Sequence, residues 1–407
     1  MATVYPFRGL RARPDLADRI ASVPYDVVNR AEARALAKDN ELSFLHVTKP
    51  EIDLADDVDE HDDRVYEQGK KRFFEMITKG QLVQDDKPCF YIYALTMNGQ
   101  TQTGVVLGAS VAEYDKNIVR KHEHTRPDKE NDRVHHIRTT TAQTGTVFLV
   151  HRRSEAIGAV VKATTGKKPA VDLTASDQIR HQLWVIDDAA YIKKIAEGFA
   201  ALGPIYIADG HHRSAAASRV AAAMRKPGTA ADAPFEMFLA VSFPEDEVRI
   251  LPYNRVVKDL AGKTAWEFLA EVKKRFDVTD GKPSVTQAKQ FALYLDGKWY
   301  TVKVRAGSYD AKDPVKRLDV SLVQDQLLAP LLNITDPRRD QRIDFVGGIR
   351  GDAELERRVR EGCAVAISMH PTSSSDLFAI ADAEQVMPPK STWFEPKLRD
   401  GMVVHRI

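Results

Sequence analysis

The sequence predicts an α/β protein with mixed sheets, because a strand-turn-helix unit and two hairpins occur along its 407 residues. Near the middle of the chain, residues 205–207 are β-branched or aromatic, which is typical of a buried strand. The alanine-rich segment from His211 to about Met224 predicts a helix. A turn must therefore lie at Asp209-Gly210, and this unit has the highest density of chemically active side chains in the sequence.

The N-terminal residues predict helices with one strand between them. Residues 31–38 and 64–79 predict the two helices, and the second ends at Gly80, a common helix stop. Residues 44–47 predict the strand, because the segment is short and apolar.

Residues 90–95 and 102–111 predict a hairpin, since Asn98-Gly99 between them is a strong turn signal. We expect these to be central strands. Two further buried strands and a helix are expected before the central unit, at 144–150, 182–186 and 189–201 respectively.

Beyond the central unit, residues 236–242 predict a strand that could pair beside 205–207. The remaining elements are strands at 251–257, 342–348 and 363–369, helices at 266–276 and 318–332, and a hairpin of 291–295 with 299–304. We expect three parts: a core at 1–255, a small α+β subdomain at 256–315, and a C-terminal segment at 316–407 that returns to the core.

Composition narrows the class of protein. Lys plus Arg number 59 against 58 Asp plus Glu, so the chain lacks the basic excess that drives non-specific nucleic-acid binding. Cys89 and Cys363 lie far apart and match neither a disulfide framework nor a CxxC metal site. No stretch of about eighteen apolar residues occurs, and the N-terminus lacks the apolar region of a signal peptide. We expect a cytoplasmic protein with no membrane segment and no nucleic-acid partner.

The turn at Asp209-Gly210 is a candidate anion site. Glycine can take a positive φ and lets a ligand approach the backbone. The first turn of the following helix leaves N–H groups without partners, which favours anions. His211, His212 and Arg213 add donors and positive charge, and phosphate is the ligand that this set indicates. The alternative is an ordinary strand-helix junction in which Asp209 caps the helix.

Residues 120–136 form a second polar region, in which His122-Glu123-His124 has three interpretations. As metal ligands, the two histidines would lie on one face of a strand and bind zinc or another transition metal, although no HExxH spacing occurs. As an acid-base element, Glu123 could take a proton from a substrate hydroxyl. The third interpretation is a solvated charged loop.

Together the two regions indicate phosphoryl transfer or phosphate-ester chemistry, because one offers a general base and the other a phosphate site. The sequence has no GxxxxGK(S/T) loop, no kinase HRD or DFG set and no GxSxG elbow. The common nucleotide-binding folds are therefore not expected.

Six motifs occur in order along the chain: Phe7-Arg8-Gly9, Val23-Pro24-Tyr25-Asp26, Lys121-His122-Glu123-His124-Thr125, Asp132-Arg133, Ala208-Asp209-Gly210-His211-His212-Arg213 and Met387-Pro388-Pro389-Lys390-Ser391-Thr392. The set resembles the bacterial and archaeal family catalogued as domain of unknown function 1015. The turn at 209–213 is similar to the strand-turn-helix signature of the ParB/sulfiredoxin superfamily, above all to that of free-serine kinases, which has the same residue types. The resemblance implies a ParB/sulfiredoxin-like core with additional α+β subdomains. The sulfiredoxin cysteine and the DNA-binding helices of ParB are absent.

The same resemblance implies an enzyme that transfers a phosphoryl group from ATP or ADP to free L-serine, giving O-phosphoserine. A Mg²⁺ ion would bridge the phosphates, without a dedicated protein metal site. The roles carried over are catalysis for Glu123, His122, Asp209 and His212, nucleotide binding for Gly210, His211, Arg213 and Ser214, and substrate binding for Asp26, Arg133 and Lys390. Glu123 is the general base in this scheme, with Asp26 and Asp209 as competing carboxylates.

Two other functions stay open. A phosphatase would use the histidine-rich region with a metal and would release inorganic phosphate from a phosphoserine-like ester without nucleotide. A non-catalytic regulator in the style of ParB would bind nucleotide tightly without turnover, and its DNA binding would weaken steeply as salt rises.

Overall fold

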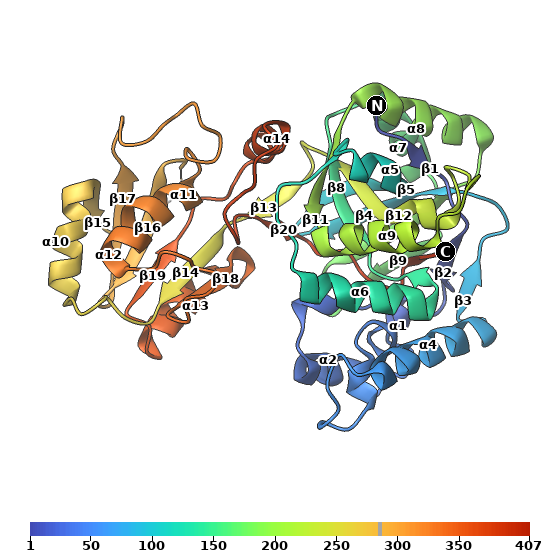
Figure 1. The fold of residues 1–407 in the computed structure, drawn as a ribbon, viewed down its shortest axis with the longest axis horizontal. Helices are drawn as coiled ribbons and strands as arrows, with labels where there is room; N and C mark the ends of the chain where they lie inside the picture. The colour runs from blue at the N-terminus through green and yellow to red at the C-terminus, as the bar shows by residue number, and fades with distance from the viewer. Residues whose placement is uncertain (284–286) are drawn as a thin grey trace. The chain divides into compact units, whose positions relative to one another are not determined.

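The computed structural model of the chain describes residues 1–283 and 287–407, which divide into two compact units (Figure 1). Unit 1 comprises residues 1–248 and 396–407, and unit 2 comprises residues 249–395. Both units combine helices with sheets, and the sheet of unit 1 contains parallel and antiparallel pairs. The predicted α/β class with mixed sheets is confirmed.

Unit 1 is built around one large sheet. A smaller sheet lies in the same unit. The strands of the two sheets are β1 (Val4–Tyr5), β2 (Gly9–Ala12), β3 (Leu82–Gln84), β4 (Phe90–Met97), β5 (Gln100–Ser110), β6 (Val119–Arg120), β7 (Ala142–Gln143), β8 (Val147–His151), β9 (Val171–Thr174), β10 (Arg180–Ile186), β11 (Ile205–Asp209), β12 (Met237–Pro244) and β21 (Val403–Arg406). The large sheet has the order β6-β11-β8-β12-β5-β4-β10-β9, with β1 also paired to β5. The small sheet has the order β3-β2-β21-β7, so the C-terminal strand completes unit 1.

Helices surround these sheets. They are α1 (Ala17–Ile20), η1 (Tyr25–Val27), α2 (Arg30–Ala37), α3 (Leu45–Thr48), η2 (Pro50–Asp53), α4 (Asp63–Thr78), α5 (Val111–Asp115), α6 (Pro127–Thr140), α7 (Glu155–Thr165), α8 (Ala189–Leu202), α9 (His211–Met224) and η3 (Pro234–Glu236). The core joins strands and helices through side chains such as Leu107, Leu149, Ile195, Phe199 and Ile207, all fully buried. Burying each side chain of this size contributes roughly 1.5–3 kcal/mol.

Helix α9 lies beside α6 and also contacts α5, β8 and β12 (Figure 1). Its alanines favour the helix and keep its surface narrow, so neighbouring elements approach closely. Ala215, Ala216, Ala217 and Ala221 are all buried. The start of α9 is therefore held in place by packing along the helix.

Two local predictions for unit 1 are wrong. Residues 45–47 lie in the short helix α3, with Phe44 at its N-cap, and do not form a strand. A short apolar run does not distinguish a helix from a strand. Strand β12 does not pair beside β11, since β8 lies between them. The hairpin β4-β5 is confirmed, with Met97 opposite Gln100 at the turn.

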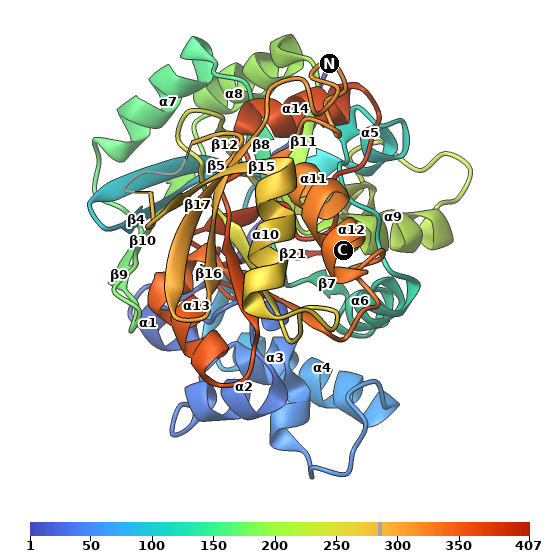
Figure 2. The ribbon, with the colours of Figure 1, turned by 90° about the vertical axis from the view of Figure 1, so that its left-hand side faces the viewer.

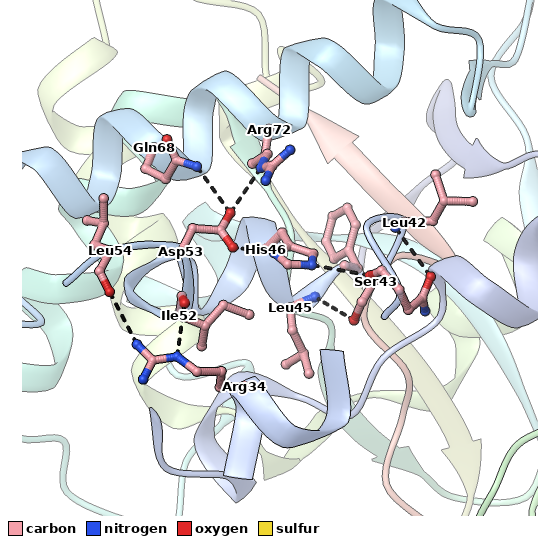
Figure 3. A network of polar contacts seen from close by, with 12 residues as sticks. Arg34, Leu42, Ser43, Leu45, His46, Ile52, Asp53, Leu54, Gln68 and Arg72 are labelled. Carbon is pink, nitrogen blue, oxygen red and sulfur yellow. Dashed lines mark hydrogen bonds and ion pairs between the residues drawn. The ribbon is translucent and has the colours of Figure 1, made fainter. Parts of the chain in front are cut away.

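A polar network explains why α3 is stable in spite of its length (Figure 3). His46 Nδ1 lies 2.7 Å from Asp53 Oδ1, and the other oxygen of Asp53 accepts hydrogen bonds from Gln68 and Arg72 of α4. Burial opposes ionisation of Asp53, but these partners outweigh it and lower its pKa to about 2. One carboxylate thus ties α3, η2 and α4 together.

Unit 2 has an antiparallel sheet of order β15-β17-β16-β19-β14-β18 and the separate pair β13-β20. Its strands are β13 (Arg249–Leu251), β14 (Tyr253–Val257), β15 (Phe276–Asp280), β16 (Gln290–Leu295), β17 (Lys298–Val304), β18 (Ile343–Gly347), β19 (Val365–Ser368) and β20 (Trp393–Glu395). Its helices are α10 (Ala265–Arg275), α11 (Asp319–Val323), η4 (Gln324–Leu328), α12 (Ala329–Leu332), η5 (Gly348–Arg350), α13 (Gly351–Arg360) and α14 (Ser374–Asp382).

The strand pairs of unit 2 explain which residues belong to this unit. Helix α13 packs on β14, β16 and β19, and α10 contacts β15 and α12 (Figure 2). Strands β18 and β19 pair with β14 and β16, so residues 316–395, expected to return to the core, lie in unit 2 with the predicted subdomain. The helix predicted at 318–332 is interrupted by a π-helical turn, η4.

None of the helices in the described residues combines the length and the hydropathy that crossing a bilayer requires.

Candidate functional site

The end of β11 carries an irregularity that sets the direction of Asp209. Ile207 pairs with Leu149 and Asp209 pairs with Phe148, so Ala208 is an extra residue on β11. Such a β-bulge bends the strand and turns the following side chains. Asp209 is therefore aimed by the bulge and does not continue the alternation of the strand.

Gly210 connects β11 to α9 with a φ of 97°. Only glycine adopts this conformation without strain. A Cβ atom here would lie 3.2 Å from Cζ of Arg213 and 3.3 Å from the Cα of Val147. Close packing against Arg213 and the backbone therefore requires glycine here, in addition to the positive φ. Helix α9 begins without a side-chain cap, so the alternative in which Asp209 caps the helix is wrong.

Arg213 is the centre of the site, and its side chain is buried. Its Nη2 donates to Asp209 Oδ2 at 2.8 Å and to Asp26 Oδ2 at 3.2 Å, and its Nη1 donates to Thr146 O. Lys397 Nζ lies 3.9 Å from the same oxygen of Asp209. Burial opposes ionisation of Asp209, but the charges of Lys397 and Arg213 outweigh it and hold its pKa well below the usual range. Asp209 is therefore ionised.

His211 joins this cluster to Glu123. The backbone N–H of His122 points at His211 Nε2, 3.5 Å away, and the His211 Nδ1 atom lies 3.8 Å from Glu123 Oε2. Burial and the neighbouring His122 hold the pKa of His211 far below its usual value, so the ring is neutral. Because Nε2 faces a donor, the ring proton is on Nδ1 and faces the carboxylate. Glu123 is about half exposed, so it can meet a ligand from solvent.

His122 and His212 are also neutral at neutral pH. Burial lowers the pKa of His122 to about 4, and its ring packs edge-on against His211 at 4.5 Å. Burial also lowers the pKa of His212, whose Nε2 accepts the backbone N–H of Arg126 at 3.0 Å. The expectation that histidines add positive charge is thus wrong, and Arg213, Lys397 and the backbone N–H groups supply it. His122 and Glu123 follow β6 in a loop and not on a strand.

Asp400 lies beneath the cluster and was not found from the sequence. Its side chain is buried, and its Oδ2 has no hydrogen-bond partner among the described residues. Burial raises the pKa of Asp400 to about 7, although the nearby Arg213 opposes this. Lys397 and Asp400 belong to the C-terminal segment, residues 396–407, which lies in unit 1. No local sequence pattern indicates that either residue belongs to the site.

Arg133 of α6 is largely covered, with 11% of its side chain exposed, and is already paired. Its guanidinium stacks 3.8 Å from the ring centroid of Tyr25 and lies 2.6 Å from Asp132. A cavity of about 20 Å³ between Arg133, Tyr25 and Arg213 has room for one water molecule. Direct contact between Arg133 and a substrate stays a prediction.

The remaining predicted residues lie elsewhere. The Ser214 hydroxyl donates to His211 O at 3.0 Å, so it is used inside α9. Lys390 belongs to unit 2, where its Nζ lies 5.3 Å from the ring centroid of Tyr253. Within residues 1–283 and 287–407, no group of three or more His, Cys, Asp or Glu side chains is arranged to hold a metal ion.

Residues 4–321 match the family described as protein of unknown function DUF1015. The chain belongs to this family. The DUF1015 match contains Asp26, His122-Glu123 and the turn at 209–213, and it ends before Lys390, Lys397 and Asp400. No curated protein matches the sequence.

Three solved structures are similar to the DUF1015 chain at low identity. A variant of a free serine kinase in complex with ADP is 13% identical, with a TM-score of 0.35, covering 72% of this chain and 88% of that one. A conserved hypothetical protein from Pyrococcus furiosus is 13% identical, with a TM-score of 0.34, covering 73% and 93%. SbnI with a C-terminal truncation, from Staphylococcus aureus, is 9% identical, with a TM-score of 0.37, covering 72% and 85%. At these values the superpositions carry no information about function.

Proposed function

We propose that this chain transfers a phosphoryl group from ATP or ADP to the hydroxyl of a small metabolite, with free L-serine as the acceptor. The observation that carries the proposal is the grouping of the uncapped start of α9 with Arg213 and Lys397, next to the half-exposed carboxylate of Glu123. The first turn of a helix binds phosphate through its N–H groups. The likeness of the turn at 209–213 to that of free-serine kinases supports serine as the acceptor.

In the proposed reaction Glu123 is the general base. Its carboxylate takes the proton of the serine hydroxyl while the hydroxyl oxygen bonds to the terminal phosphorus of the nucleotide. The bond from that phosphorus to the bridging oxygen breaks, and the shortened nucleotide leaves with the electron pair. The neutral ring of His211, with Nδ1 facing Glu123 at 3.8 Å, positions the base. General-base catalysis contributes roughly 10²–10⁴-fold to rate.

Asp209 and Asp26 fit the Mg²⁺ ion that phosphoryl transfer uses. Both carboxylates accept hydrogen bonds from Arg213 Nη2, so they lie next to each other. Mg²⁺ is commonly held by one or two carboxylates together with phosphate oxygens. The ion would add positive charge beside Arg213 and Lys397, since Asp26 and Asp209 offset part of the charge of Arg213. The substrate contacts of Asp26, Arg133 and Lys390 and the catalytic role of His212 stay predictions.

The test incubates the full chain with Mg²⁺, ATP or ADP, and a panel of hydroxyl-bearing metabolites that includes L-serine, with products followed by ³¹P NMR. We expect O-phosphoserine in stoichiometric balance with ADP or AMP. Glu123→Gln keeps the shape of the side chain but not its basicity, so turnover should fall by about 10²–10⁴-fold with little change in nucleotide affinity. Glu155→Gln, at an exposed acid in the first turn of α7, is the matched control and should keep full turnover.

Three results would contradict the proposal. If no metabolite in the panel is phosphorylated, the chain is not this kind of transferase. Inorganic phosphate released from O-phosphoserine without nucleotide would indicate a phosphatase. Tight nucleotide binding without turnover, unaffected by Glu123→Gln, would indicate a regulator.

A further inference from the structure

Arg255 of β14 is a buried cation that forms no ion pair with a carboxylate among the described residues. Its side chain is 3% exposed. Its Nη1 donates to Tyr253 O, and its Nη2 lies 3.4 Å from Lys390 O. In the part of unit 2 that the structure describes, no carboxylate forms an ion pair with it. Burial lowers the pKa of Arg255 to about 10, so the guanidinium is still charged at neutral pH.

Other arginines of unit 2 behave differently. Arg342 pairs with Asp340 at 2.7 Å, and Arg358 pairs with Glu354 at 2.9 Å, although both are more exposed than Arg255. A guanidinium has five N–H donors, and the carbonyl groups of Tyr253 and Lys390 accept from only some of them. The ring of Phe345, 5.6 Å away, compensates some of the charge. Since burying an unpaired charge is destabilising, Arg255 is better explained by an anion that binds to it than by the fold.

Lys390 brings a second cation to the same place. Its Nζ lies 5.3 Å from the ring centroid of Tyr253, the residue whose carbonyl accepts from Arg255. Its side chain is exposed, and within the described residues it too has no carboxylate partner. Both cations therefore lie around Tyr253, and neither is neutralised.

The loop that carries Lys390 is held in one conformation. Ser391 Oγ donates to Pro388 O at 2.6 Å, and Thr372 Oγ1 donates to Ser391 O at 2.9 Å. Lys390 itself has a φ of 58°, which is uncommon for a residue with a side chain. Such strain persists only where the surrounding contacts enforce it, and it is frequent at binding sites. The Pro-rich motif at 387–392 thus presents Lys390 at a fixed position.

We propose that unit 2 contains an oxyanion-binding site formed by Arg255 and Lys390, which takes the phosphate or carboxylate group of a small metabolite. Arginine pairs with either group through two parallel hydrogen bonds, and lysine adds a point charge. The ring of Tyr253, supported edge-on by Trp393 at 5.1 Å, forms an apolar wall beside the anion. This site goes beyond the phosphoryl transfer proposed for the start of α9 and does not depend on it.

Thermal unfolding of the full chain tests the proposal, at constant ionic strength with chloride, inorganic phosphate or acetate as the anion. The two anions distinguish a phosphate ligand from a carboxylate ligand. We expect one of them to raise the unfolding temperature of unit 2 in the wild type and to lose this effect in Arg255→Met. Lys390→Met should weaken binding of that anion about tenfold or more. Lys303→Met, at an exposed lysine of β17, is the matched control and should respond like the wild type.

Arg255→Met in chloride alone separates a binding role from a structural one. Because methionine removes a buried unpaired charge, this variant should unfold at the same temperature as the wild type or above it. A lower unfolding temperature would make Arg255 a structural residue and overturn the proposal. An equal response of wild type, Arg255→Met and Lys390→Met to both anions would also overturn it, since such a response is a general salt effect.

Discussion

Replacing Asp400 by asparagine tests the electrostatics at the base of the candidate site. Burial raises the pKa of this carboxyl from 3.8 to about 7, so the folded chain binds its proton more tightly than the unfolded chain does. Between these two values the unfolded chain is ionised and the folded chain is protonated. Stability that Asp400 contributes at low pH is therefore lost as the pH rises from about 4 to about 7.

The magnitude follows from the same two values. One pKa unit corresponds to about 1.36 kcal/mol, so the interval from pH 5 to pH 7 corresponds to roughly 3 kcal/mol. Asparagine does not ionise and can still accept a hydrogen bond through its side-chain oxygen. The free energy of unfolding of Asp400→Asn, relative to wild type, should therefore increase by up to roughly 3 kcal/mol over this interval and stay constant above pH 8.

Urea titrations at pH 5, 6, 7 and 8, followed by circular dichroism, measure this difference. Any separate transition of unit 2 is an internal control, because Asp400 belongs to unit 1 and should not affect it. If the difference between Asp400→Asn and wild type is the same at all four pH values, Asp400 is already ionised in the folded chain and the reasoning fails.

Two further substitutions test the elements that position the site. Gly210→Ala should destabilise unit 1 by about 1–3 kcal/mol in urea titrations, because φ is 97° and the new Cβ would press on Arg213 at 3.2 Å. Gly166→Ala is the control, since its φ of −69° is ordinary, and an equal loss in both variants would contradict the argument. Asp53→Asn should cost roughly 2 kcal/mol at pH 7, because partners lower the pKa of Asp53 from 3.8 to about 2. That contribution is present above pH 4 and is lost as the pH falls towards 2, so a cost that persists undiminished at pH 3 would disprove the assignment.

Local patterns in the sequence were sufficient for most elements. Helix α9 begins at His211 and ends at Met224, as the alanine-rich segment predicts, because helix propensity acts within a few residues. The turns of the two hairpins also follow from their own residues, Asn98-Gly99 and Asp296-Gly297. The strand predicted at Phe44–Val47 is wrong because a four-residue apolar run is compatible with a helix as well as with a strand. The contact between His46 and Asp53 favours the helix.

The sequence by itself determined the α/β class, the strand-turn-helix unit and the candidate residues at its turn, from Asp209 to Arg213. Only the tertiary structure decided which contacts these residues make and which of them are charged. It brings Asp26 and Asp400 to Arg213, and Lys397 to Asp209, from distant parts of the chain. It also buries His211 and His122, so that both are neutral. It also leaves Arg255 buried and charged, in a segment where the sequence predicts only a strand. Charge state depends on burial and on partners far along the chain, and neither is encoded in a local pattern of residues.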